Sequence, residues 1–414
     1  MVLGTRILET DQKYRILFVT DAVEPFQMGG VEHRVFSLAR ELAKSHTVYI
    51  LTSMNKKVTS KEGVTFLKSA PLVLTRTPGS RSILQTCLYS FSLFFTPILK
   101  RQFDVIIVES IPYIHFLPLI LRRIKKNSIL LCDVHEIWIR YKGRGIKNNI
   151  LTRSLIRIML KMFIRKADAL LAVSETTKAS LKFVPEATQK RISVVPNGID
   201  SGSLNERNIL QIDRRHSENI IYDFISVGRL DPIKRPLDFV KALDVLKREY
   251  NWTGKAAIVG TGGMISRVKA LRSELKLQTN LEITGYLDEN EKNRLLASSN
   301  IYILCSEREG FSISTLEAMS FGLPAIVSVP DFKEVFGVSD FVIEGFNGLF
   351  FKVSDFNSLA KQMNLLLKDV NMLDSLSANA IETANKYLWS EICKNFLKTL
   401  GDMVNIDSTN NKFL

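Results

Sequence analysis

The stretch LCSEREGFSISTLEAMSFGLPAIVS, residues 304–328, decides the fold class of this chain. It begins at the end of an apolar segment, residues 301–304, whose composition predicts a buried strand. A charged loop follows, and a helix is expected over residues 314–321, because a glycine and a proline come shortly after it. A second apolar strand is predicted at residues 325–329. In such a strand–loop–helix–strand unit, ligands bind at the carboxyl ends of the strands, where helix N-termini present free N–H groups to anions.

Two acids lie at that position. Glu309 is in the loop and Glu317 is in the first turns of the helix, with seven residues between them. One interpretation is structural: Ser314 and Glu317 fit a capping box, and Glu309 is a solvated loop acid. The other is functional, because one carboxylate can accept hydrogen bonds from two hydroxyl groups at once. The two acids alone do not separate these interpretations.

Length and composition predict an intracellular globular protein. The 414 residues predict two or three domains. Residues 1–12 are polar and lack the apolar core of a secretory signal. The longest apolar run, residues 83–99, contains polar residues and falls short of the roughly 20 apolar residues of a membrane span, so it predicts one or two buried or interfacial helices. A reduced protein is expected, because four distant cysteines show no metal-type spacing: Cys87, Cys132, Cys305 and Cys393.

The positive charge is concentrated in the first half of the chain. Residues 1–200 hold 31 Lys and Arg against 15 Asp and Glu, whereas residues 201–414 hold 25 against 27. Such a basic half indicates an anionic partner, either phospholipid or nucleic acid. Nucleic acid is disfavoured, because the aromatic residues of this half lie in apolar runs and do not alternate with Lys and Arg as stacking platforms.

The N-terminal half opens as a Rossmann-type unit. A strand at residues 14–20, a loop ending in Gly29 and Gly30, a helix at 31–44 and a strand at 48–51 are predicted. The glycines do not form the Gly-x-Gly-x-x-Gly pattern, so NAD is not expected, and paired glycines before a helix are more often a tight turn. Further strands are predicted at residues 105–109, 129–132, 169–173 and 192–195.

A single histidine, His135, follows the strand at 129–132. A lone histidine near a strand end is usually structural. No set of metal ligands surrounds it in sequence, so no metal site is expected there.

A basic stripe runs along a helix predicted at residues 150–166. Its cations recur at every fourth position beside a broad apolar face. Like charges at this spacing repel by a few tenths of a kcal/mol per pair. An anionic membrane surface explains the stripe better, since each basic residue adds about 1 kcal/mol there. The alternative, a core helix with a basic solvent face, stays open. The stripe consists of Arg153, Arg157, Lys161 and Arg165.

The C-terminal half repeats the strand series after a polar linker at residues 201–219. Its first strand, 222–227, ends at Arg229, and Lys234 stands at the head of a helix over 235–250. Arg229 provides a fork of donors and Lys234 a compact charge, a combination that suits a diphosphate. Further strands are predicted at 256–259, which leads into a glycine turn beginning at Gly260, and at 281–285.

Taken together, these motifs resemble the retaining glycosyltransferases of family four, which have the GT-B fold. The resemblance rests on Glu-Gly-Phe, the second Glu eight positions later, Ala-Met and Gly-Leu-Pro, together with the Gly-Arg and Lys pair. It implies that Glu309 faces the donor sugar, Glu317 binds the ribose, Arg229 and Lys234 bind the diphosphate, and His135 contacts the sugar. It also implies donor contacts by Gly29, Gly30, Gly260, Gly310, Phe311 and Ser312. The sequence departs from the family at residues 330–334, where the family has paired glycines near the donor phosphates.

The resemblance implies an α/β fold of two Rossmann-like parallel-sheet domains that face a cleft. Residues 1–205 would form the acceptor-side domain and residues 206–385 the nucleotide-sugar domain. A C-terminal helix within residues 386–414 would cross back to the N-terminal domain.

The implied function is retaining transfer of a hexose or N-acetylhexosamine from a nucleoside diphosphate sugar to a glycan or lipid-linked acceptor. A UDP-sugar is the first expectation and a GDP-sugar the second. No cofactor is expected, and no Asp-x-Asp metal motif is present in the sequence, so Arg229 and Lys234 would take the role of a metal. The protein would act in the cytoplasm on the inner face of the membrane. Two alternatives remain: a nucleotide-sugar 2-epimerase of the same fold, or a non-catalytic GT-B subunit.

Overall fold

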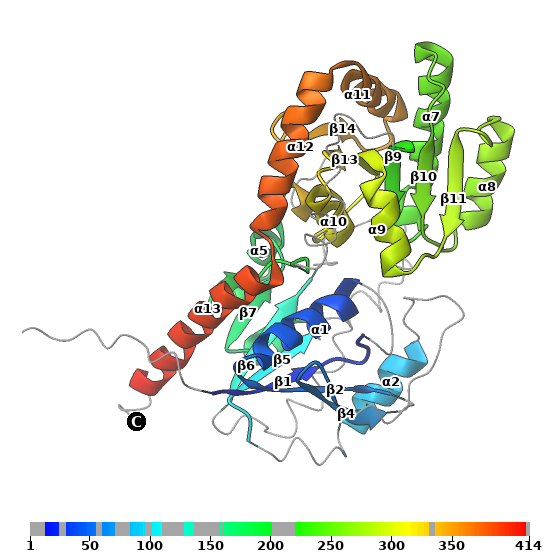
Figure 1. Ribbon diagram of the computed structural model, residues 1–414. Helices are drawn as coiled ribbons and strands as arrows, with labels where there is room; N and C mark the ends of the chain where they lie inside the picture. Colours follow the sequence, from blue (N-terminus) through cyan, green and yellow to red (C-terminus); the bar gives the residue numbers. More distant parts are fainter. Residues whose placement is uncertain are drawn as a thin grey trace, which may run out of the picture. The chain divides into compact units, whose positions relative to one another are not determined.

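The chain divides into two compact units. One comprises residues 1–173, 178–196 and 389–414, and the other comprises residues 174–177 and 197–388. Their boundary lies after Pro196, earlier than the predicted domain end at residue 205. This computed structural model describes residues 13–24, 30–54, 60–70, 83–93, 95, 102–109, 128–135, 158, 160–200, 220–330 and 336–410 (Figure 1). The predicted linker, residues 201–219, and residues 331–334 of the departure at 330–334 lie outside the described residues.

The described part of the first unit contains one sheet in the order β3-β4-β2-β1-β5-β6-β7-β8. All neighbouring strands are parallel except β3 and β4. The central strands β1 and β5 are short, nearly continuous apolar runs, as expected for parallel strands that are covered on both faces. The strands are β1 (Arg15–Val19), β2 (Thr47–Ser53), β3 (Ser60–Lys61), β4 (Val64–Ala70), β5 (Val105–Glu109), β6 (Ile129–Val134), β7 (Ala169–Ala172) and β8 (Arg191–Val194).

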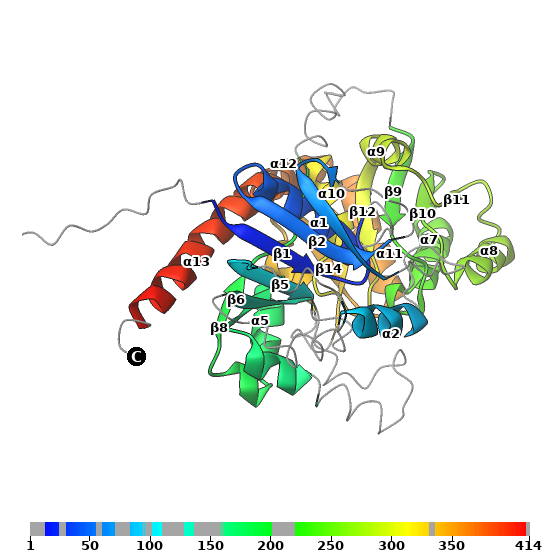
Figure 2. The same ribbon diagram turned by 90° about the horizontal axis from the view of Figure 1, so that it is seen from below.

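Four α-helices carry residues of this unit, besides a helical segment at residues 160–166 and a 3-10 turn at Pro185–Ala187 in the described part of the chain. The last, α13, runs beside α1 in both views (Figures 1 and 2). Its buried side chains include Trp389, Phe396 and Leu400, which recur at helical spacing. The helix therefore belongs to the first unit, although the residues that precede it belong to the second. The helices are α1 (Gly30–Ala43), α2 (Ile83–Ser92), α5 (Glu175–Leu181, of which the first residues belong to the second unit) and α13 (Trp389–Asn410).

The second unit contains a parallel sheet in the order β11-β10-β9-β12-β13-β14. Its strands are β9 (Tyr222–Val227), β10 (Ala256–Val259), β11 (Leu281–Gly285), β12 (Ser299–Leu304), β13 (Ala325–Val329) and β14 (Gly348–Lys352). Its helices are α7 (Pro236–Tyr250), α8 (Ile265–Glu274), α9 (Glu289–Ala297), α10 (Ile313–Ser320), α11 (Phe356–Lys368) and α12 (Val370–Asn385), with 3-10 turns at Pro232–Lys234 and Gly337–Asp340.

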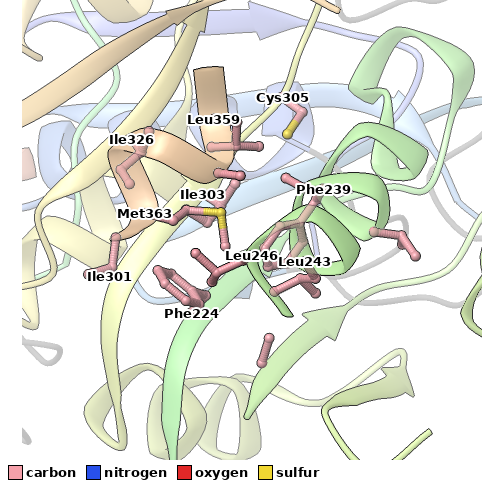
Figure 3. Close-up of a cluster of buried hydrophobic side chains, with 14 of the residues drawn as sticks. Phe224, Phe239, Leu243, Leu246, Ile301, Ile303, Cys305, Ile326, Leu359 and Met363 are labelled. Atoms are coloured by element: carbon pink, nitrogen blue, oxygen red, sulfur yellow. The ribbon is translucent and has the colours of Figure 1, made fainter. Parts of the chain in front are cut away.

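The core of the second unit lies between this sheet and the helices α7 and α11 (Figure 3). Phe239, Leu243 and Leu246 recur at helical spacing on α7 and pack toward Phe224 of β9. Each such fully buried side chain stabilises the fold by about 1.5–3 kcal/mol relative to exposure. This core fixes β9 and β12, whose carboxyl ends carry the candidate site.

Candidate functional site

The carboxyl ends of β9, β10 and β12 surround a small cavity. Its lining includes Gly228, Arg229, Lys234 and Ser306. Gly260 lies at the end of β10 with φ +132°, and a Cβ at this residue would stand 1.9 Å from the carbonyl oxygen of Gly228. Only glycine allows this approach of two strand ends, so the backbone itself forms one wall of the site.

The two predicted diphosphate ligands differ in their surroundings. Arg229 is exposed and forms an ion pair of 3.4 Å with its neighbour Asp231. Lys234 ends a 3-10 turn just before α7 and donates a hydrogen bond to Glu309. Ser306 also donates to Glu309, over 2.9 Å. Lys234, Glu309 and Ser306 form one contiguous polar cluster, and the side chain of Glu309 is only 11% exposed, so it is not a solvated loop acid.

The loop that carries Glu309 contacts a second segment, at Gly337, that the sequence analysis did not identify. The backbone N–H of Gly337 donates to the carbonyl of Glu309 over 2.7 Å. A Cβ on Gly337 would lie 2.0 Å from the carbonyl oxygen of Gly310. The sequence shows Gly337 as an ordinary loop glycine, and only the fold reveals that it must approach this loop closely.

Phe311 and Ser312 have side chains committed to the fold. The Phe311 ring packs against Phe341 and Tyr387, with ring centroids 4.9 and 5.8 Å away. Ser312 is the N-cap of α10, and its hydroxyl accepts a hydrogen bond from the N–H of Thr315. Their side chains therefore anchor the loop and the helix start, and any donor contact would come from their backbone.

The second acid, Glu317, is not a capping residue. The N-cap of α10 is Ser312, so the predicted capping box from Ser314 to Glu317 does not form. Instead, Glu317 accepts a hydrogen bond of 2.9 Å from Lys292 on α9. Lys292 also contacts Glu289 over 2.7 Å. Lys292 lies 25 residues from Glu317 in sequence, which is why no local pattern identified it.

In the first unit, His135 follows a buried ion pair. Arg34 of α1 donates to both carboxylate oxygens of Asp133, over 2.9 and 3.0 Å, and to the carbonyl of Pro196 over 2.8 Å. Burial opposes ionisation of Asp133, but Arg34 and His135 outweigh it and lower the pKa of this carboxyl. The Nε2 atom of His135 lies 3.5 Å from Asp133 Oδ2. Arg34 thus fixes the strand end that carries His135, and sequence reasoning missed it because its partner is 99 residues away.

The basic stripe is only partly described, and its charge is partly compensated. Lys161 and Arg165 both lie 3.2 Å from one carboxylate oxygen of Glu186. Glu186, which lies outside the predicted helix, therefore compensates part of the charge of these two residues, and the membrane-surface role of the stripe stays a prediction. Ile158 and Met162 on the same segment are 54% and 39% exposed. Arg153 and Arg157, like Gly29 of the glycine loop, lie outside the described residues.

Metal-ligand clusters and membrane-spanning helices are both absent from the described residues. No group of three or more His, Cys, Asp or Glu side chains among them is arranged to hold a metal ion. None of the helices in this part of the chain is long and apolar enough to cross a bilayer.

Comparison with known proteins gives two matching families. Residues 28–202 match Glycosyltransferase Family 4, and residues 212–383 match Glycosyl transferases group 1. The poly(glycerol-phosphate) alpha-glucosyltransferase of Bacillus subtilis is 27% identical over 192 residues, which cover 46% of this chain and 28% of that protein. The UDP-Gal:alpha-D-GlcNAc-diphosphoundecaprenol alpha-1,3-galactosyltransferase of Escherichia coli is 30% identical over 200 residues, which cover 46% of this chain and 48% of that protein. The chain therefore matches less than half the length of each of these two curated relatives.

Solved structures extend the similarity to nearly the whole chain. Sucrose-phosphate synthase from Thermosynechococcus elongatus superposes with a TM-score of 0.78 and 18% sequence identity. The match covers 95% of this chain and 100% of that one. It confirms the predicted fold class of two parallel-sheet α/β domains.

Proposed function

Because the two matched families together cover residues 28–202 and 212–383, the chain belongs to the group 1 and family 4 glycosyltransferases of GT-B fold, and from this we propose that it transfers a sugar from a nucleoside diphosphate sugar to an acceptor. The observation that carries the proposal is the cluster at the strand ends of the second unit. There Arg229 and Lys234 line one cavity, and Glu309 accepts hydrogen bonds from Lys234 and Ser306 of that lining. A diphosphate needs the cations and sugar hydroxyls need the carboxylate.

Each side chain of the cluster has a role in this reaction. Arg229 and Lys234 bind the diphosphate and stabilise the negative charge that gathers on it as the nucleotide leaves. Glu309 accepts hydrogen bonds from the sugar hydroxyls and orients the sugar, and Glu317 binds the ribose. As the family resemblance implies, His135 is a further contact of the donor sugar. We place backbone N–H groups of Gly310, Phe311 and Ser312 at the sugar or phosphate, since they precede the start of α10.

The finer chemistry follows from the same residues. As the family resemblance implies, the acceptor attacks the anomeric carbon on the face that the nucleotide leaves, so the configuration is retained without a covalent glycosyl-enzyme. The cations replace a metal, so no cofactor is needed. The donor is a UDP-sugar in the first instance, as in the name of the Escherichia coli relative, with a GDP-sugar as the second candidate.

The acceptor is a glycan or lipid-linked molecule met at the inner membrane surface. Both curated relatives above are named for polymeric or lipid-linked acceptors. In the first unit, Phe91 of α2 and the neighbouring Phe95 are 65% and 69% exposed, with ring centroids 5.2 Å apart, and Leu88 one turn earlier is 38% exposed. Exposed aromatic side chains at helical spacing suit the interface of a bilayer. Phe91 and Phe95 therefore support peripheral membrane binding better than Lys161 and Arg165, whose charge is partly compensated by Glu186.

The test of the proposed function is transfer or hydrolysis across UDP-, GDP- and ADP-sugars, with and without EDTA. We expect turnover of one donor that persists in EDTA and disappears in Glu309→Ala. Complete loss with EDTA would overturn metal independence. Absence of both turnover and nucleotide binding would overturn the transferase proposal itself. The product anomer, read by NMR, decides between retention and inversion.

Membrane binding is tested separately by sedimentation with anionic phospholipid vesicles. We expect Phe91→Ser combined with Phe95→Ser to reduce binding at least several-fold. Phe183→Ser is the matched control, because Phe183 is also in the first unit and is 51% exposed, but lies on another element. Equal binding by the wild type and both variants would refute the role of α2.

A further inference from the structure

Lys292 on α9 joins two acids of different exposure. Its Nζ lies 2.7 Å from Glu289 Oε1 and 2.9 Å from Glu317 Oε2. The side chain of Lys292 is 13% exposed and that of Glu317 is 17% exposed, whereas Glu289 is 67% exposed. The contact with Glu317 is the shielded one, and charges interact more strongly where water is excluded. Figure 1 shows the two helices concerned, α9 and α10.

The surroundings of Lys292 stabilise its protonated form. Burial opposes protonation, but the carboxylates of Glu317 and Glu289 outweigh it and raise the pKa of this ammonium. A cation that stays charged and nearly buried holds a carboxylate in a fixed orientation more firmly than a solvated lysine, which is free to rotate.

The interaction uses only one oxygen of Glu317. Lys292 donates to Oε2, and no hydrogen bond to Oε1 is formed by the described residues. Because the side chain is still partly exposed, a ligand can reach Glu317 without breaking the contact with Lys292.

We propose that Lys292 is the positioning residue for ribose recognition: it holds Glu317 Oε2 so that Oε1 accepts a hydrogen bond from a ribose hydroxyl of the donor nucleotide. This inference rests on the proposed function and deepens it. A site built to bind a hydroxyl rejects an analogue that lacks the hydroxyl, because the buried acceptor is left without its partner. The preference for ribonucleotides over deoxyribonucleotides therefore depends on Lys292, although Lys292 itself does not touch the nucleotide.

The test is calorimetric titration of UDP, 2′-deoxy-UDP and 3′-deoxy-UDP, repeated with the GDP and ADP series if UDP does not bind. For the wild type we expect one deoxy analogue to bind at least about tenfold more weakly than its ribonucleotide. In Lys292→Met this ratio falls to below about threefold, and the loss falls on the ribonucleotide. Glu289→Gln is the matched control: it removes the exposed partner of Lys292 and should keep the wild-type ratio.

Two variants extend the test. Glu317→Gln should lower the ratio as Lys292→Met does, because it removes the charged acceptor. If Lys292→Met does not fold, Lys292→Gln replaces it, and its neutral amide should still lower the ratio several-fold. A folded Lys292 variant with the wild-type ratio overturns the inference and leaves Lys292 as a structural link between α9 and α10. A wild type that binds none of these nucleotides and turns over no donor overturns the proposed function and this inference with it, which distinguishes that failure from a failure of Lys292 alone.

Discussion

Replacing Glu309 by Gln should tighten the binding of UDP while it abolishes sugar transfer. In the structure, the ammonium of Lys234 is bound to Glu309, so this predicted ligand of the diphosphate already contacts a carboxylate. A diphosphate that recruits Lys234 competes with that carboxylate and lies near its negative charge. The Gln variant removes both effects and keeps the shape of the side chain, although an NH2 donor replaces one of the two acceptor oxygens.

The size of the effect follows from the exposure of the pair. The side chains of Lys234 and Glu309 are 27% and 11% exposed, so their surroundings lie between bulk water and protein interior. Two unit charges about 4 Å apart interact by about 1 kcal/mol in water and by about 4 kcal/mol at an effective dielectric constant of 20. Some of this is lost because Lys234 can contact both anions at once. We therefore expect a gain of about 1–2 kcal/mol, or roughly 5- to 30-fold in the Kd of UDP.

Calorimetric titration of UDP into the wild type and Glu309→Gln measures this gain directly. Asp231→Asn is the control, because Asp231 forms a comparable ion pair with Arg229 that is exposed to solvent, 58% on the arginine side. Exposed pairs contribute about 0–1 kcal/mol, so this variant should change the Kd by less than fivefold. Weaker or unchanged UDP binding by Glu309→Gln would refute the reasoning, since it would mean that Lys234 does not contact the diphosphate.

Three further outcomes are expected. Gly260→Ala should abolish nucleotide binding and lower the Tm, because the new Cβ meets a backbone carbonyl at 1.9 Å, whereas Gly263→Ala, with nothing within 4 Å, should leave both unchanged. Burial lowers the pKa of His46, so the unfolded chain binds the proton at a higher pH than the folded chain, and the Tm should fall as the pH drops below about 6.5. His46→Phe should reduce this fall in Tm, and an unchanged dependence of Tm on pH would contradict the argument. Arg34→Met should reduce the free energy of unfolding in urea by about 3–5 kcal/mol, and adding Asp133→Asn should restore part of it, because the uncompensated buried charge is then removed.

The sequence predicted the strands better than the helices that connect them. β1, β9, β10 and β13 form at the predicted positions, because a parallel strand covered on both faces is a nearly continuous apolar run. The helix α8 gave no such signal, since Val268 is its only buried residue and no apolar stripe repeats along it. The edge strand β14 and the β3–β4 hairpin were likewise not predicted. Their short runs differ little from loops before their neighbours in the sheet are known.

The same distinction holds within the site. Glu309 and Glu317 were identified because eight positions on one loop and helix form a local pattern. Lys234 was identified as a diphosphate ligand but not as the partner of Glu309, and Lys292 was not identified at all, because Lys234 is 75 residues from Glu309 and Lys292 is 25 residues from Glu317. Sequence spacing reports which groups share an element, whereas a charge pair between elements depends on how the sheet orders its strands. The capping-box interpretation of Glu317 failed for a local reason: the helix begins earlier than expected, with Ser312 and not Ser314 as its N-cap.

The pairing of Lys234 with Glu309 bears on how the site distinguishes a complete donor from its parts. A free diphosphate can recruit Lys234 only by leaving Glu309, nearly buried, without its cation, which is unfavourable. A nucleoside diphosphate sugar brings hydroxyls that can take over the hydrogen bonds of Glu309 while its phosphates take Lys234. The sugar then adds affinity beyond its own contacts, because it compensates the acid that the diphosphate exposes. We therefore expect a large difference between the Kd of UDP and that of the UDP-sugar in the wild type. In Glu309→Gln, where no carboxylate remains to be compensated, this difference should be nearly absent.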